Sequence, residues 1–239
     1  MKLIITWISQ YKWIWFGALL ALIIALGVGY YFWFYLPAAQ KNQAGQQVTQ
    51  MTTFEIKDKS LPQDVQDKYA SAFATSTKFF LANQNNLIAF DALLKMGLIK
   101  QMAGDYTGAE QIYLYTYKLE PNSYILNGNL GHLYTYYLKN YPKAEEFYQK
   151  AMATAEKGNL YVYFTEMYDL YHDGFKDPAK VQALLTQATT VIPDSPQLQR
   201  IAGDYYRSVG NIAEARKYYE QALRLDPNDE VSKRALENL

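Results

Sequence analysis

The feature that most constrains the fold is a short segment that recurs four times along the chain. It reads GDYTGA at 104–109, KNYPKA at 139–144, KDPAKV at 176–181 and GNIAEA at 210–215, so its last residues are 35, 37 and 34 apart. Gly, Asn and Asp tolerate the unusual backbone angles of tight turns. A period of this length is typical of stacked helix pairs, which predicts that each copy is the turn between two helices.

Residues at fixed positions around these turns form a second pattern. The last repeat has Ala202, Gly203, Tyr206, Gly210, Ala215, Tyr219, Ala222 and Pro227, and the first has Met96, Gly97, Gly104, Ala109, Tyr113 and Pro121. The second has Leu130, Gly131, Tyr134, Ala144, Tyr148 and Ala151, lacks the closing Pro and is one residue longer between its helices. The third has Met167, Tyr171, Leu185, Ala188 and Pro193. Over residues 87–239 this pattern resembles the tetratricopeptide repeat (TPR) family, although Lys100 stands where that family usually has an aromatic residue.

The resemblance implies an all-α fold, an α-solenoid of about four TPR helix pairs with a C-terminal capping helix. Small residues such as Gly131 are expected where paired helices approach closely, and large ones such as Tyr148 are expected to fill the space beside Ala144. No repeat buries its apolar face alone, so stacking supplies the core. The capping helix is predicted over 229–239, with Asn228 or Asp229 as its N-cap.

Ahead of the repeats, residues 14–36 run without a charge. A helix of that length spans about 34 Å, which is enough for a hydrocarbon core of about 30 Å. Aromatic residues flank both ends, as at a membrane interface, and Pro37 is expected to stop the helix. The alternative is a cleaved signal peptide, but its apolar region would be shorter and the residues around Pro37 form a poor cleavage site. We therefore predict an uncleaved transmembrane helix after a short tail, 1–13.

Positive charge near the span predicts its orientation. Lys2 and Lys12 precede it and only Lys41 follows closely, which favours a cytoplasmic N-terminus and a C-terminal domain outside the cytoplasm, in a bacterial cell membrane. Within the span, small residues recur every four positions, at Gly17, Ala21, Ala25 and Gly29. Such a row lets helices pack closely in lipid, so homo-oligomerisation through this face is one interpretation. The other is that Gly and Ala are simply frequent in membrane helices.

Two segments connect the span to the repeats. Residues 37–60 are rich in Gln, Asn, Thr and Gly and predict a juxtamembrane linker, with a partly helical form left open. Residues 61–86 predict an amphipathic lead-in helix, with Ser60 as its N-cap, Pro62 in its first turn and the Asn-rich segment from Asn83 at its end.

Composition excludes several classes of function. All 23 acidic residues and all but Lys2 and Lys12 of the 23 basic ones lie in 41–239, so this part has a net charge of −2 and offers no basic surface for nucleic acid. The chain has no Cys, which excludes disulfides and thiolate chemistry. His132 and His172, the latter near Asp169 and Asp173, are more simply surface histidines than metal ligands. No catalytic motif or cofactor-binding loop is present, so we expect neither an enzyme nor a cofactor.

In the TPR family the first helices of the repeats line a groove for peptides. Counting along those helices, the residues expected to face it are Leu94, Leu98, Gln101, His132, Thr135, Tyr136, Asp169, His172, Arg200, Asp204 and Arg207. Each can also be an ordinary solvated side chain. Arg200 and Arg207 share a face, and Asp204 between them can pair with either. Leu94 and Leu98 occupy positions where some TPR proteins clamp carboxylates, which argues against an acidic C-terminal tail there.

These observations favour a membrane-tethered adaptor or scaffold that presents a TPR groove to a protein or peptide partner. Its layout is similar to that of bacterial translocon-associated TPR proteins, which is an analogy of architecture only. The alternative is a self-associating structural subunit of a membrane or envelope assembly, for example one associated with a translocon or with secretion. An enzyme, or the regulatory subunit of one, is a third and weaker interpretation.

Overall fold

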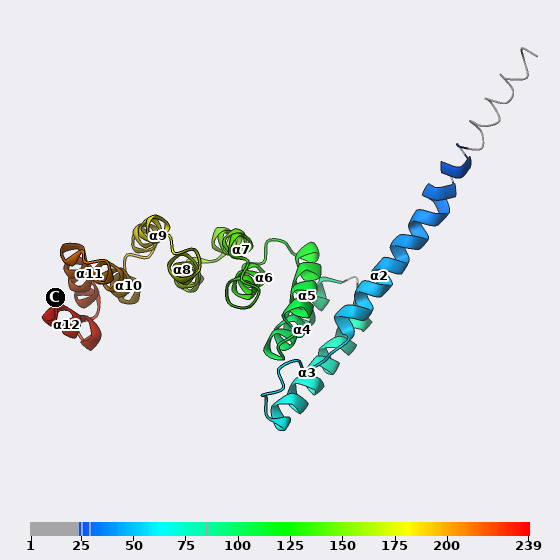
Figure 1. Ribbon diagram of the computed structural model, residues 1–239, viewed down its shortest axis with the longest axis horizontal. Helices are drawn as coiled ribbons and strands as arrows, with labels where there is room; N and C mark the ends of the chain where they lie inside the picture. Colours follow the sequence, from blue (N-terminus) through cyan, green and yellow to red (C-terminus); the bar gives the residue numbers. More distant parts are fainter. Residues whose placement is uncertain (1–23, 25, 29, 85) are drawn as a thin grey trace, which may run out of the picture. The chain divides into compact units, whose positions relative to one another are not determined.

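A computed structural model describes residues 24, 26–28, 30–84 and 86–239, and the chain divides into two units, Met1–Thr53 and Phe54–Leu239. The described part of the first unit is helical (Figure 1). A π-helical turn, η1 (Tyr31–Tyr35), continues directly into α2 (Leu36–Thr52). Residues 37–52 of the predicted linker are thus one continuous helix.

Pro37 does not stop this helix, contrary to expectation. A proline inside a helix removes one hydrogen bond and clashes with the carbonyl four residues back. Here the N–H of Leu36 bonds to the carbonyl of Tyr31, five residues back, so the turn is widened just before the proline. The π-turn therefore accommodates Pro37 and the helix goes on.

Of the predicted transmembrane helix, 14–36, residues 14–23, 25 and 29 lie outside the described residues. Among those that are described, we find no helix with both the length and the apolar content needed to cross a membrane. The row of Gly17, Ala21, Ala25 and Gly29 lies wholly outside them. The aromatic side chains of residues 30–35 are exposed. Both the span and its packing face stay predictions.

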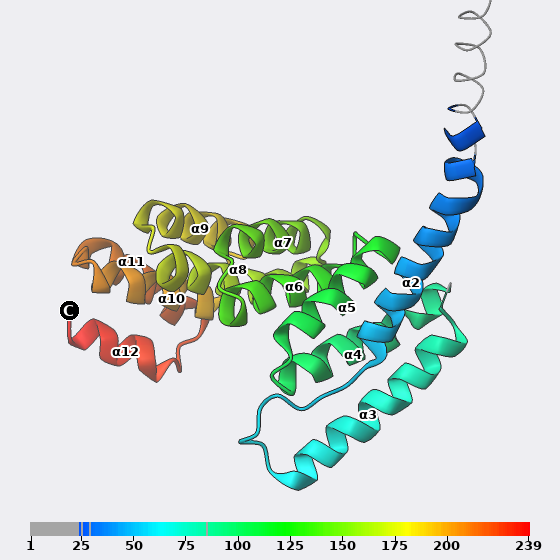
Figure 2. The same cartoon turned by 45° about the vertical axis from the view of Figure 1, so that its right-hand side comes forward.

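The second unit is a row of antiparallel helix pairs, an all-α solenoid with no strand among the described residues. It begins with α3 (Gln63–Ala82) and a short 3-10 turn, η2 (Leu87–Ala89). The pairs are α4 (Phe90–Met102) with α5 (Tyr106–Leu119), α6 (Tyr124–His132) with α7 (Tyr141–Thr154), α8 (Leu160–Asp169) with α9 (Pro178–Val191), and α10 (Pro196–Ser208) with α11 (Ile212–Leu225). The capping helix α12 (Glu230–Glu237) follows, N-capped by Asp229. Figure 2 shows the pairs in succession from α4 to α12.

The first, second and fourth pairs are held by glycines on first helices facing tyrosines on second helices, as predicted, whereas α8 has no glycine and α9 no tyrosine. A Cβ added to Gly131 would come within 2.5 Å of the Tyr148 ring, and one added to Gly203 within 2.8 Å of Tyr219. The tyrosines are fully buried, as are Ala144 and Ala215. The close approach of the two helices therefore depends on the missing side chain.

The second and third pairs absorb one extra residue each as a π-helical turn at the end of the first helix. These are η3 (Leu133–Tyr137) and η5 (Leu170–Phe175). Both lead into a lysine with left-handed backbone, Lys139 and Lys176 (φ +53°), where the first and last pairs have Gly104 and Gly210. The additional residue predicted for the second repeat is thus confirmed, and it leaves the turn intact.

Residues 54–58, the strap, lie across the end of the first helix pair. The backbone N–H groups of Lys57 and Asp58 both donate to the carbonyl of Ala103, at 2.8 and 2.9 Å. The Phe54 ring stacks on Phe73 of α3, with centroids 4.6 Å apart. The C-terminal end of the predicted linker is therefore part of the folded second unit.

Buried charge fixes the strap. Asp105 accepts from Lys100 at 2.9 Å and from Lys57 at 2.5 Å, and it also caps α5 by accepting from the N–H of Gly108. Lys100, the residue that departs from the family pattern, is 4% exposed and lies over the Phe73 ring. The predicted N-cap of α3 is wrong, because the Ser60 hydroxyl donates to Asp58 and Pro62 occupies the cap position.

Candidate functional site

The first helices of the first three pairs enclose a hollow of about 310 Å³, here called the first-helix groove. It is lined by Leu98 and Gln101 of α4, by Ile125, Gly128, Asn129 and His132 of α6, by Tyr148 of α7, and by Val162, Tyr163 and Glu166 of α8. Gly128 sits where a Cβ would meet the Tyr163 ring at 2.6 Å. The groove thus has both apolar walls and hydrogen-bonding groups.

Glu166 is the polar centre of the groove. Its Oε2 accepts from the Tyr148 hydroxyl at 2.7 Å and lies 3.4 Å from the Nδ1 of His132. Burial alone would raise the pKa of Glu166, but hydrogen bonds from His132 and Tyr148 outweigh it and hold the pKa below 4.5. Glu166 is therefore a stable carboxylate at neutral pH.

A second carboxylate, Asp169, lies one turn further along α8. It accepts from the Tyr136 hydroxyl at 2.7 Å, and the Tyr136 ring lies against His132, with centroids 4.5 Å apart. Burial raises the pKa of Asp169 above 3.8, and the nearby charges of Glu166 and Asp173 add to the effect. The two acids thus share one polar network but differ in how well their charge is tolerated.

The structure brings together only part of the predicted site. Gln101 and His132 line the groove, and Tyr136 and Asp169 adjoin it through the network just described. Leu98 also lines it, whereas Leu94 packs against the core and Thr135 is buried, donating to the carbonyl of Gly131. His172 is exposed and pairs with its neighbour Asp173 at 2.6 Å. Among the described residues, no group of three or more His, Asp or Glu side chains is placed to bind a metal.

The predicted arginine cluster lies elsewhere, beside α12. Asp204 pairs with Arg207 at 3.5 Å and accepts from the Tyr219 hydroxyl at 2.6 Å. Arg200 does not pair with Asp204 but lies 3.8 Å from Asp229, the N-cap of α12. The expectation that Asp204 serves either arginine is therefore corrected: the capping helix supplies a second acid for Arg200.

Glu166 and Tyr148 were not among the predicted site residues. Tyr148 was assigned to packing, which its ring confirms, but its hydroxyl continues to the groove. Tyr219 of the last repeat does the same toward Asp204, so the hydroxyl at this repeated position contacts a first-helix carboxylate twice. The sequence does contain a signal for this contact: an acidic residue on a first helix, within reach of the tyrosine at this repeated position.

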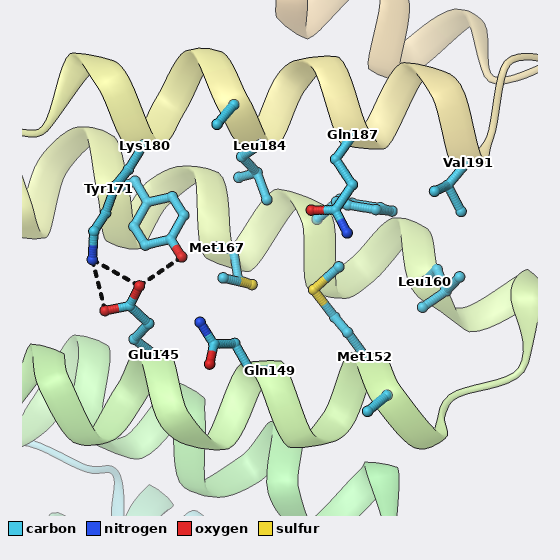
Figure 3. Close-up of a pocket in the computed structure, with 13 residues that line it drawn as sticks. Glu145, Gln149, Met152, Leu160, Met167, Tyr171, Lys180, Leu184, Gln187 and Val191 are labelled. Atoms are coloured by element: carbon cyan, nitrogen blue, oxygen red, sulfur yellow. Dashed lines mark hydrogen bonds and ion pairs between the residues drawn. The ribbon is translucent and has the colours of Figure 1, made fainter.

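A larger hollow, of about 600 Å³, lies among α7, α8 and α9, away from the first-helix groove (Figure 3). Its walls are mainly apolar, with Met152, Met167 and Leu184 among them. At one end Glu145 pairs with Lys180 at 2.7 Å and accepts from the Tyr171 hydroxyl at 2.8 Å. These charges satisfy each other, so nothing in this hollow selects a charged ligand.

Family models for repeats match two segments of the chain. A tetratricopeptide repeat model covers residues 128–158, and a second covers residues 196–229. These segments coincide with the second and fourth helix pairs. Both segments are tetratricopeptide repeats. No functionally curated protein matches the sequence.

Solved structures agree with the TPR fold. A crystal structure of MamA is 22% identical at a TM-score of 0.53, with 73% of this chain and 96% of that one covered. MamA 41-end from Desulfovibrio magneticus RS-1 is 16% identical at a TM-score of 0.50, covering 74% and 99%. The match to a chain of the APC/C hetero-tetramer Cut9–Hcn1 is 16% identical at 0.46 and covers 62% of this chain but only 29% of that one. These likenesses concern the fold.

TPR domains bind protein partners and generally act as scaffolds. The two matched repeats therefore indicate a scaffold for protein–protein interaction. In the first-helix groove, apolar walls lie beside Glu166, a carboxylate with no Lys or Arg partner among the described residues.

Proposed function

We propose that this protein is a single-pass membrane adaptor that holds its TPR unit outside the cytoplasm and docks a segment of a partner protein in the first-helix groove. The observation that carries the docking role is the groove itself, where Leu98, Ile125 and Val162 present exposed apolar surface beside Glu166. A concave site that combines apolar walls with a few placed polar groups is typical of a ligand-binding site.

The sequence of residues 14–36 supports the membrane part of the proposal. It has no charge over 23 residues, aromatic residues at both ends, and more positive charge before than after it. Protease added to intact spheroplasts is expected to digest the TPR unit. Full protection would reject this orientation while leaving the fold untouched.

Site-specific crosslinking tests the docking role. A photoreactive benzoylphenylalanine replaces Ile125 in the groove, and a control chain carries it at Ile212, which is exposed on α11. In native membranes, light is expected to join Ile125 to another protein and to leave the control unjoined. The absence of any adduct at Ile125 would reject docking in this groove.

A second candidate is self-association into a structural assembly, which the row of Gly17, Ala21, Ala25 and Gly29 favours in the sequence. The same experiment separates the two. An adduct at Ile125 that contains only a second copy of this chain would favour the assembly, and an adduct with a different protein favours the adaptor.

A further inference from the structure

The charges of the first-helix groove are unevenly distributed. The first helix of the second pair and its π-turn, 124–137, contain no Lys, Arg, Asp or Glu. The corresponding part of the third pair, 160–175, contains Glu166, Asp169 and Asp173 and no Lys or Arg. His132 and His172 are therefore the only basic side chains on these two walls, so the walls carry net negative charge at neutral pH.

On α4, the third wall, Asp91 and Lys95 are both exposed and contribute no net charge. The lysines of the second helices α7 and α9 are engaged within this chain. Lys143 pairs with Glu110 at 3.3 Å, Lys150 with Glu146 at 2.7 Å, and Lys180 with Glu145 at 2.7 Å. Each of these lysines also lies over an aromatic ring. These cations are therefore matched by acids of their own, away from Glu166 and Asp169.

The groove also presents aliphatic side chains at its rim. Leu98, Ile125 and Val162 come from three successive first helices and are 45%, 47% and 51% exposed. All three line the same hollow as Glu166. A ligand that fills this hollow thus contacts aliphatic surface and a carboxylate together.

We propose that the first-helix groove selects a partner segment in which a lysine or arginine lies next to an aliphatic side chain. The cation pairs with Glu166 and Asp169, and the aliphatic side chain packs among Leu98, Ile125 and Val162. This rests on the docking role proposed above and adds the chemistry of the partner. Arginines on α10 would suit an acidic segment instead, but Arg200 and Arg207 each already have an acid partner within this chain.

The electrostatics of Asp169 agree with a cationic ligand. Its pKa is raised by burial and by the charges of Glu166 and Asp173. An incoming ammonium or guanidinium group relieves this repulsion and gains charge-assisted hydrogen bonds to both acids. An acidic segment would add to the repulsion instead.

The test compares three fluorescent synthetic peptides of one length and one leucine-rich sequence, which differ only in carrying two Lys, two Gln or two Glu. Binding to the full chain in detergent micelles is followed by fluorescence anisotropy. The lysine peptide is expected to bind about tenfold more tightly than the other two, as befits charge-assisted hydrogen bonds. Its affinity is expected to fall as NaCl is raised, because salt screens charges.

The variant Glu166→Gln with Asp169→Asn is expected to lose the tenfold preference for lysine. The matched control is Glu146→Gln, which removes an acid from the second-helix side, where it pairs with Lys150, and is expected to keep the preference. Melting curves verify that both variants fold. Should the double variant not fold, Asp169→Asn alone and the salt dependence of the unaltered chain decide the matter.

Equal binding of the three peptides, no binding of any, or a lysine preference that survives in the double variant would overturn the inference. The docking role fails separately, when Ile125 yields no adduct in membranes. An adduct whose partner segment carries no Lys or Arg would keep docking and reject the cationic partner.

Discussion

At the scale of single residues, Glu166 and Asp169 stand one turn apart on α8 with opposite relations to their surroundings. Hydrogen bonds from His132 and Tyr148 lower the pKa of Glu166 despite its burial, whereas burial raises the pKa of Asp169. The folded state therefore favours the ionised form of Glu166 and disfavours that of Asp169. The charge of Glu166 therefore stabilises the fold, whereas the charge of Asp169 destabilises it and gains more from binding a cation.

This predicts opposite effects of neutralising each acid. At pH 7, Glu166→Gln is expected to lower the free energy of unfolding by about 1 kcal/mol, since it weakens two hydrogen bonds to a charged group. Asp169→Asn is expected to leave it unchanged or raise it. Urea unfolding of the full chain in detergent measures both, and two changes of the same sign would contradict the assignment.

The pH dependence follows from the same shifts. A carboxylate with a lowered pKa stabilises the fold above its unfolded pKa and loses that contribution as pH falls through the folded value. The deficit of Glu166→Gln is therefore expected at neutral pH and should vanish at pH values well below 4.5. For Asp169, whose pKa is raised, any gain from Asn appears at neutral pH and disappears in acid below about 3.8.

The buried charges beneath the strap predict a larger effect. Asp105→Asn keeps an N-cap for α5 but leaves Lys100 buried without its acid, and breaking such a pair costs about 3–5 kcal/mol. Changing Lys100→Met in the same chain removes the unpaired charge. The double variant is thus expected to be more stable than Asp105→Asn alone, as measured by thermal melting. Equal stability of the single and the double variant would show that the Lys100 side chain can reach solvent once Asp105 is neutralised.

At the scale of elements, the turns between paired helices share a left-handed residue and an N-cap but differ in how the first helix ends. Gly104 and Gly210 have positive φ, and Lys139 and Lys176 adopt the same left-handed region after a π-turn. In all four pairs the next residue is Asp or Asn and caps the second helix. The additional residue of the middle pairs is thus absorbed inside the first helix, where it costs one widened turn and leaves the cap unchanged.

Left-handed backbone predicts a gain from glycine at the two lysines. Lys139→Gly or Lys176→Gly is expected to raise the free energy of unfolding by about 0.5–1 kcal/mol, the relief of strain less the greater freedom of the unfolded chain. Gly210→Ala is the matched opposite, because no atom lies within 4 Å of an added Cβ there and only backbone strain changes. Melting temperatures test both signs, and a loss of stability in the lysine variants would show that their side chains matter.

At the scale of the whole molecule, the solenoid was predictable because the sequence pattern that specifies a helix pair is repeated along the chain. The 35, 37 and 34 residue intervals, the glycines facing tyrosines and the N-capped turns each recur, so local errors average out. Single events were not predictable. The strap and the pairing of Arg200 with Asp229 each occur once and depend on contacts between residues distant in sequence.

The candidate site was only partly predictable for a similar reason. Counting along first helices selected Gln101 and His132, and both line the hollow between these helices. It missed Glu166, because that acid acquires its role from a tyrosine of the preceding pair. Spacing within a helix shows which residues share a face, but the partners that fix a charge come from the neighbouring repeat.

The strap also determines where a mechanical load enters the second unit. The chain passes from residue 53 into Phe54, whose ring is stacked on α3, and then to two N–H groups held by one carbonyl and to Lys57, paired with Asp105. A pull on residue 53 is therefore taken up first by these bonds at the end of α4. Leu98 and Gln101 near this end of α4 also line the first-helix groove, so a load on residue 53 enters the second unit directly beside the groove.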